Sequence, residues 1–124
     1  MHWTDDWIGL PHAERGRGPG YDCLGLFVTI TRVRSGAVVD DPLCTVATSR
    51  AAARKLRAHW SPVRDAPREG DAALFRIRGH ALHVGYVLDR HRMLHIEDDT
   101  GSRIERWDGL LWKPRLEGLY RHAG

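Results

Sequence analysis

Asparagine and glutamine do not occur anywhere in this chain of 124 residues. Any catalytic or orienting role that an amide side chain fills elsewhere must therefore fall to His, Asp, Glu or the backbone. Cysteine is scarce, since the chain has only Cys23 and Cys44, and neither stands in a CxxC arrangement. This spacing argues against a zinc ribbon and a thioredoxin-like motif, and we expect Cys44 to serve packing.

Long apolar runs and dense charge runs are also missing. No stretch approaches the roughly 20 apolar residues that a membrane helix needs. The N-terminal segment MHWTDDWIGLPH lacks the basic and apolar regions of a signal peptide. We therefore expect synthesis in the cytoplasm, no membrane insertion, export only by another route, and no structural disulfide. The net charge is +3 and the basic residues are scattered, which argues against a nucleic-acid partner.

Helical patterns occupy the first half of the chain. A hydrophobic content of 42% and a charged content of 28% are typical of a globular protein, and we expect a single domain over 1–124. Three helices are predicted: over 2–10 with Thr4 as N-cap, from the N-cap Asp22 to about Gly36, and over 49–60, opened by Ser49 and ended by Pro62.

The second half changes to short segments rich in β-branched and aromatic residues, separated by turn residues. The predicted strands are 71–78, 81–89, 92–98, 102–107 and 116–122, and a turn is predicted over 67–71. Helices followed by an antiparallel sheet indicate an α+β domain rather than an alternating, doubly wound one.

The stretch GPGYDCLGLF places Cys23 on the first turn of a predicted helix, directly after a flexible loop. A free cysteine is most often a small core residue. At a helix start, however, the positive end of the helix dipole favours the thiolate, which is the nucleophilic form. Cys23 alone does not decide between these two interpretations.

Two histidines lie on neighbouring predicted strands. If the hairpin closes symmetrically about Asp89, His83 stands directly opposite His95 and the Cβ atoms lie about 5 Å apart. The opposite face then holds the predicted core residues Leu82, Val84, Tyr86, Leu88, Leu94 and Ile96. With Cys23, the two rings would make a set of nucleophile, base and orienter.

Other interpretations of these histidines remain open. The pair could be a satisfied polar contact under the sheet, or two metal ligands with His80 or His91 as a third. Three-residue spacing on a strand places His80 on the opposite face from His83, and His91 lies at the turn, so we expect no metal. Trp107 and Trp112 are sugar-stacking platforms, core residues or contacts to a partner.

Four pieces, in this order and spacing, carry a resemblance: Asp22-Cys23-Leu24-Gly25, the E-G-D turn at 69–71, His83-Val84-Gly85, and His95 twelve residues after His83. Together they resemble the NlpC-type cysteine peptidases, which are papain-like bacterial cell-wall hydrolases with a Cys-His-His set. The opening HWTDDWIGLP and the loop GRGPG look closest to compact phage-tail and gene-transfer-agent members. The resemblance implies a papain-like α+β domain with N-terminal helices packed on a C-terminal antiparallel sheet.

The resemblance also implies a function, which is hydrolysis of an amide bond in the peptidoglycan stem peptide through a thioester. Cys23 would attack the carbonyl, His83 would carry the proton and His95 would orient His83, without metal or cofactor. His12, Asp22 and Leu24 would border the substrate and the oxyanion. His12 stands where many members have Tyr, and Leu24 where many have Ser.

The expected partners are the stem peptide and proteins of a tail particle, which would bring the enzyme to the periplasmic cell wall. The alternative is a structural or assembly protein of such a particle that keeps the fold and has lost turnover. The absence of Tyr at position 12 favours this alternative.

Overall fold

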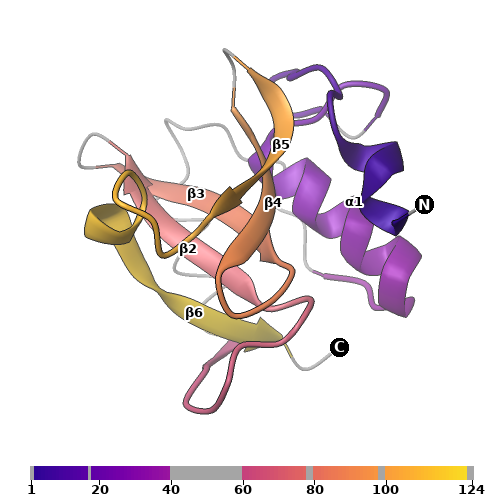
Figure 1. Cartoon of the computed structure of the whole chain (residues 1–124). Helices are drawn as coiled ribbons and strands as arrows, with labels where there is room; N and C mark the ends of the chain where they lie inside the picture. The colour runs from indigo at the N-terminus through magenta and orange to yellow at the C-terminus, as the bar shows by residue number, and fades with distance from the viewer. Residues whose placement is uncertain (1, 17, 40–59, 78–79, 98–99, 123–124) are drawn as a thin grey trace.

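A single α-helix packs on one face of a six-stranded antiparallel sheet in the computed structural model, which describes residues 2–16, 18–39, 60–77, 80–97 and 100–122 (Figure 1). The strand order is β1-β6-β2-β3-β4-β5. The elements are η1 Trp3–Trp7, α1 Cys23–Ser35, β1 Trp60–Pro62, β2 Ala72–Ile77, β3 His80–Val87, β4 Arg92–Glu97, β5 Gly101–Arg106, η3 Lys113–Arg115 and β6 Leu116–His122. The predicted α+β class is confirmed.

The N-terminal element is shorter than predicted and begins differently. It is a 3-10 helix whose N-cap is His2, because the His2 ring accepts a hydrogen bond from the Thr4 N–H. Thr4 is buried inside the element, and its hydroxyl lies 2.8 Å from the same ring nitrogen. The prediction of Thr4 as N-cap is therefore wrong by two residues, since a histidine nitrogen replaces the expected hydroxyl as the capping acceptor.

Helix α1 begins and ends as the sequence predicts. Asp22 is the N-cap, and its Oδ1 accepts a hydrogen bond from the Gly25 N–H at 2.6 Å. At the other end Gly36 has a φ of 75°, a left-handed conformation that glycine adopts without a Cβ penalty. Its N–H donates to the Arg32 carbonyl, which would otherwise lack a partner at the helix end.

The predicted helix over 49–60 lies mostly outside the described residues, but its final residue is a strand residue. Trp60 begins β1, which pairs with β6, so the prediction is wrong at this position. The Trp60 ring packs 5.7 Å from the Phe27 ring, and this burial favours an extended segment on the sheet. Pro62 belongs to the same strand. Because β1 lies at the edge of the sheet, the missing N–H of proline does not interrupt hydrogen bonding between two neighbouring strands.

The β3–β4 hairpin has a different register from the predicted one. Val87 pairs with Met93, whereas closure about Asp89 would pair it with His91. Asp89 widens the turn, because its Oδ1 accepts hydrogen bonds from the N–H groups of His91 and Arg92. The register changes by two residues, so every side chain keeps its predicted face.

The two faces of the sheet carry separate apolar clusters. The cluster between α1 and the sheet contains Leu24, Leu26, Phe27 and Ile30 of the helix and Ala72, Leu74, Val84, Tyr86, Leu94 and Ile96 of the strands. The predicted core face of the hairpin is confirmed here, with Leu88 partly buried against it and the Leu82 side chain outside the described set. The other face holds Ala73, Phe75, Val87, Met93 and Trp112, and by alternation His83 and His95 belong to it.

Candidate active site

His83 and His95 are in direct contact. His83 Nε2 lies 2.7 Å from His95 Nδ1, the ring centroids are 5.0 Å apart, and the planes are nearly perpendicular at 83°. Both residues are buried, with exposed fractions of 4% and 0%. The structure thus brings together the two rings that the strand spacing predicts to be neighbours.

The contact is diagonal rather than directly across the hairpin. Extending the observed register by two residues places His95 opposite Gly85, and His83 lies two residues further along β3. Diagonal neighbours on one face are within reach of long side chains. A Cβ at Gly85 would collide with the Met93 side chain. Glycine at this position therefore leaves room for Met93.

Trp112 covers both rings. It stacks on His83 with centroids 5.0 Å apart and planes 16° apart, and it meets His95 edge to face at 5.0 Å. Its exposed fraction is 1%, which favours the core interpretation over the sugar-stacking one. Trp107 is partly buried and donates its Nε1–H to the Asp89 carbonyl at the hairpin turn.

A carboxylate that the sequence analysis did not single out completes the chain of contacts. Glu105 Oε1 lies 2.8 Å from His95 Nε2, the ring nitrogen that His83 does not use. Arg103 Nε lies 2.9 Å from the same oxygen, as an ion pair rather than an aligned hydrogen bond. The sequence does contain a signal for this contact, because alternation along the predicted strand 102–107 places positions 103 and 105 on one face of the sheet.

His95, Glu97 and Glu105 offer ligand atoms within 4.8 Å of one another, which is a spacing that a metal ion could use. Arg103 already lies between the two carboxylates, since its Nη2 donates to Glu97 at 2.8 Å while its Nε faces Glu105. A cation would have to displace this guanidinium. We therefore interpret the group as an ion-pair network around His95 and not as a metal centre.

Burial governs the charge of His95. Desolvation lowers the pKa of its ring to about 3, and the positive charge of Arg103 acts in the same direction. His95 is therefore neutral at pH 7 and holds one ring proton.

Cys23 is the first residue of α1 and is partly buried. Helix α1 contacts β3 and β4, the two strands that carry the histidines, and Figure 1 shows it beside them. A helix start presents backbone N–H groups and the positive end of the dipole, both of which favour a thiolate or an oxyanion. A contact between the Cys23 sulfur and His83 stays a prediction.

The three further site candidates surround this helix start. Asp22 caps the helix, so its carboxylate serves the backbone. The Leu24 side chain is buried in the core, so a role of this side chain at the substrate is not supported. His12 forms an isolated parallel bridge with Tyr21, which brings the predicted loop residue beside the chain that enters α1.

The predicted E-G-D turn holds the sheet and helix together. Glu69 accepts two hydrogen bonds from Arg34, both at 3.0 Å, and one from the Tyr86 hydroxyl. Asp71 is buried and its carboxylate accepts two hydrogen bonds from the Arg121 guanidinium, at 2.7 and 2.9 Å. This contact raises the pKa of Arg121, so its guanidinium stays charged. The motif has a structural role.

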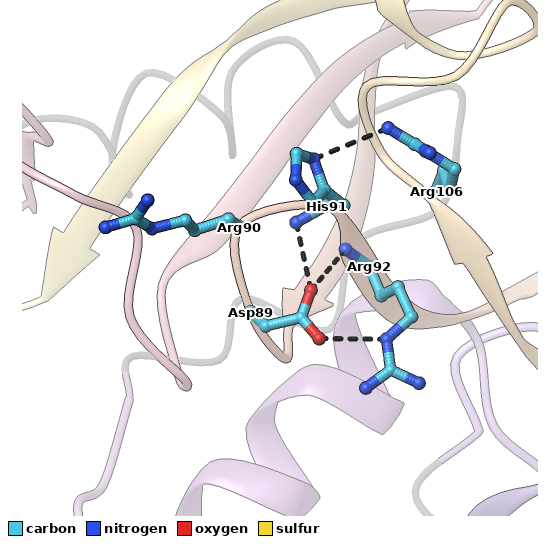
Figure 2. Close-up of a pocket in the computed structure, with 5 residues that line it drawn as sticks. All are labelled: Asp89, Arg90, His91, Arg92 and Arg106. Atoms are coloured by element: carbon cyan, nitrogen blue, oxygen red, sulfur yellow. Dashed lines mark hydrogen bonds and ion pairs between the residues drawn. The ribbon is translucent and has the colours of Figure 1, made fainter.

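A pocket of about 440 Å³ lies at the opposite end of the hairpin from His83, and Figure 2 shows its lining. Its walls are Asp89, Arg90, His91, Arg92 and Arg106. Much of its charge is already paired, because Asp89 binds the Arg92 guanidinium while Asp108 binds Arg106 and His91. The pocket lies at the hairpin turn, and neither His83 nor His95 is part of its lining.

No family model matches this sequence, and no curated protein does. Solved structures do match it. An NlpC/P60 family protein from Bacillus cereus ATCC 10987 superposes with a TM-score of 0.73 at 21% identity, covering 98% of this chain and 38% of that one. A Staphylococcus aureus subsp. aureus Mu50 protein, described as similar to a lipoprotein of the NLP/P60 family, gives 0.70 at 20% identity, covering 96% and 38%. The NlpC/p60 domain of the peptidoglycan hydrolase SagA gives 0.62 at 18% identity, covering 95% and 91%.

The chain has the NlpC/P60 fold. This confirms the predicted papain-like architecture over nearly all of the chain, although it spans 38% of the length of two of these neighbours. The level of identity supports the NlpC/P60 fold, and phage-tail or gene-transfer-agent affiliation stays a prediction. Among the described residues, no helix is long and apolar enough to span a membrane.

Proposed function

We propose that residues 1–124 act as one NlpC/P60-type domain that hydrolyses an amide bond in the peptidoglycan stem peptide. The observation that carries the proposal is the 2.7 Å contact between His83 and His95, on strands packed against a helix that begins with Cys23. A structural neighbour that is described as a domain of a peptidoglycan hydrolase supports this substrate class.

The first half-reaction forms a thioester. His83 Nε2 is engaged by His95, so Nδ1 is the ring nitrogen left to accept the proton of the Cys23 thiol. The sulfur adds to the carbonyl carbon, and the carbonyl π electrons move to the oxygen. The backbone N–H of Cys23 stabilises that oxyanion. Collapse breaks the C–N bond, and His83 returns its proton to the leaving amine.

The second half-reaction releases the enzyme. His83 Nδ1 takes a proton from water, the hydroxide oxygen bonds to the thioester carbon, and the C–S bond breaks. The sulfur recovers the proton from His83, and the product leaves as a carboxylic acid. The net reaction consumes one water for each amide bond and needs no metal or cofactor.

His12, Asp22 and Leu24 border the reacting groups in this proposal. Asp22 fixes the helix start on which Cys23 sits, and the Leu24 backbone N–H is a second candidate donor to the oxyanion. His12 lies on the segment bridged to Tyr21, where its ring would donate to substrate in place of the tyrosine of other members.

A tail-like particle is the proposed vehicle, with tail proteins as partners and the periplasmic cell wall as the place of action. The second candidate function is a structural or assembly protein of that particle without turnover. The observation that favours it is His12 at the position where a tyrosine would otherwise assist the oxyanion.

Thiol alkylation separates these two candidates. With iodoacetamide at pH 7, we expect Cys23 to react much faster than Cys44 in the same chain, because in this proposal His83 and the helix start both favour the Cys23 thiolate. The His83→Ala variant should slow Cys23 and leave Cys44 unchanged, as measured by mass spectrometry of the two tryptic peptides. Equal and slow labelling of both cysteines would favour the structural protein.

A further inference from the structure

Glu105, which the proposed mechanism does not use, lies at the end of a chain of hydrogen bonds that includes both histidines. The chain runs from Glu105 Oε1 to His95 Nε2 over 2.8 Å, and from His95 Nδ1 to His83 Nε2 over 2.7 Å. Three of the four ring nitrogens take part in these hydrogen bonds. The fourth, His83 Nδ1, is not part of this series of bonds. The chain crosses three neighbouring strands, β5, β4 and β3.

The chemistry of a carboxylate sets the direction of these bonds. An ionised carboxylate only accepts hydrogen bonds, so His95 Nε2 must donate to Glu105. A neutral imidazole carries one N–H, so His95 Nδ1 has a lone pair and must accept from His83 Nε2. When His83 is neutral, its proton is therefore on Nε2 and the lone pair is on Nδ1.

Contacts on several sides hold the Glu105 oxygen and the two rings in place. Arg103 Nε faces the same Oε1 at 2.9 Å, and the guanidinium also binds Glu97. Trp112 stacks on one ring and meets the other with its edge, so neither imidazole can turn without losing that contact. The Glu105 side chain is 23% exposed, so it lies where solvent and a rigid core meet.

We infer that Glu105 is a positioning residue, whose carboxylate fixes the tautomers of His95 and then of His83. The assignment of the tautomers does not depend on catalytic turnover. Only their effect on the reactivity of Cys23 rests on the proposed function. Without Glu105, His95 is free to carry its proton on Nδ1. That proton would face His83 Nε2 and move the lone pair of His83 away from Nδ1, the nitrogen that serves as base.

The direct test is the tautomer state of the wild-type protein. In 15N-labelled protein at pH 7, two-bond 15N–1H correlations distinguish protonated from bare ring nitrogens. We expect Nε2–H on both His83 and His95. A proton on Nδ1 of His95 would overturn the inference. This measurement requires neither a substrate nor a variant.

Variants test whether Glu105 is the cause. In Glu105→Ala we expect mixed tautomers at His95 and a loss of about tenfold in the alkylation rate of Cys23 at pH 7, in the range that outer partners of functional histidines cost. Glu105→Gln should stay close to wild type, because Arg103 orients the retained Oε1 toward both partners. Wild-type tautomers and rate in Glu105→Ala, or an equal loss in Glu105→Gln, would contradict the inference.

A matched control removes a different contact between a histidine and a carboxylate. Asp108 Oδ2 lies 2.7 Å from His91 Nδ1 at the surface of the hairpin turn, away from the histidine pair. Asp108→Asn should leave the Cys23 alkylation rate unchanged, and a loss equal to that of Glu105→Ala would overturn the assignment. Expected tautomers without cleavage of peptidoglycan would refute the proposed function alone, whereas cleavage with other tautomers would refute this inference alone.

Discussion

At the scale of single residues, the histidine pair owes its properties to burial. His95 has no exposed surface, and its ring is held between His83, Trp112 and Glu105. A charged ring in this environment would lose its hydration and face the nearby Arg103, so the neutral form is favoured. A neutral orienter is able to hold His83 through a full catalytic cycle without changing its own charge.

The burial of His95 predicts how stability depends on pH. The unfolded chain binds a proton to this histidine near pH 6.5, but the folded chain does so only near pH 3, so acid favours the unfolded state. Between pH 6.5 and 5 this residue alone should lower the free energy of unfolding by about 2 kcal/mol. Urea unfolding at several pH values measures it.

The matched variant for this prediction is His95→Asn, which keeps an acceptor for His83 and removes the titrating ring. Its free energy of unfolding should fall less steeply than that of the wild type as the pH is lowered. Identical slopes for the two proteins would contradict this prediction, because they would show that the pKa of His95 is the same in the folded and unfolded states.

Contacts between individual residues could be predicted from the sequence where they depend on a single pair of adjacent strands. His83 and His95 could be paired from their spacing, because parity along two adjacent strands fixes the shared face. Glu105 was missed because its contact needs a third strand to be added with the correct register. Trp112 remained undecided, since a tryptophan next to a groove and one under a sheet have the same sequence pattern.

At the scale of secondary-structure elements, the start of α1 is the feature on which Cys23 depends. Asp22 holds the Gly25 N–H at 2.6 Å, and this bond fixes the turn that carries the thiol. The sequence predicts this element well, because its cap, its apolar stripe and its terminal glycine all agree. The same local agreement is missing for Trp60, whose place in β1 depends on distant partners in β6.

Removing the cap should weaken the helix start. Asp22→Ala is expected to lower the free energy of unfolding by about 1 kcal/mol, because the Gly25 N–H loses its acceptor. Asp22→Ser, which retains a capping oxygen, should recover most of this loss. Urea unfolding compares the three proteins. A loss in the serine variant as large as in the alanine variant would show that the cap is not the source of the stabilisation.

The hairpin register shows why one element-level prediction failed. A symmetric turn about Asp89 is the simplest closure, but its side chain accepts two backbone hydrogen bonds and so favours a wider turn. Strand periodicity is insensitive to a shift of two residues, because such a shift preserves the faces. The pattern therefore predicted the correct faces with the wrong pairs.

At the scale of the whole molecule, the fold is shared with NlpC/P60 structures at only 18% to 21% identity. In this chain, a pattern of apolar positions and turns places α1 on an antiparallel sheet. Here the two core clusters and the ion pairs of the E-G-D turn serve that architecture. A short set of motifs was enough to predict this fold, whereas the chemistry depends on a few atoms.

Digestion of purified peptidoglycan, followed by mass analysis of the new termini, tests the central claim most directly. We predict that the wild-type protein releases fragments with one new amine and one new carboxyl group per cut in the stem peptide. Cys23→Ala and His83→Ala, folded as judged by circular dichroism, should release none. Intact peptidoglycan after incubation with folded wild-type protein, or equal cleavage by Cys23→Ala, would contradict the account.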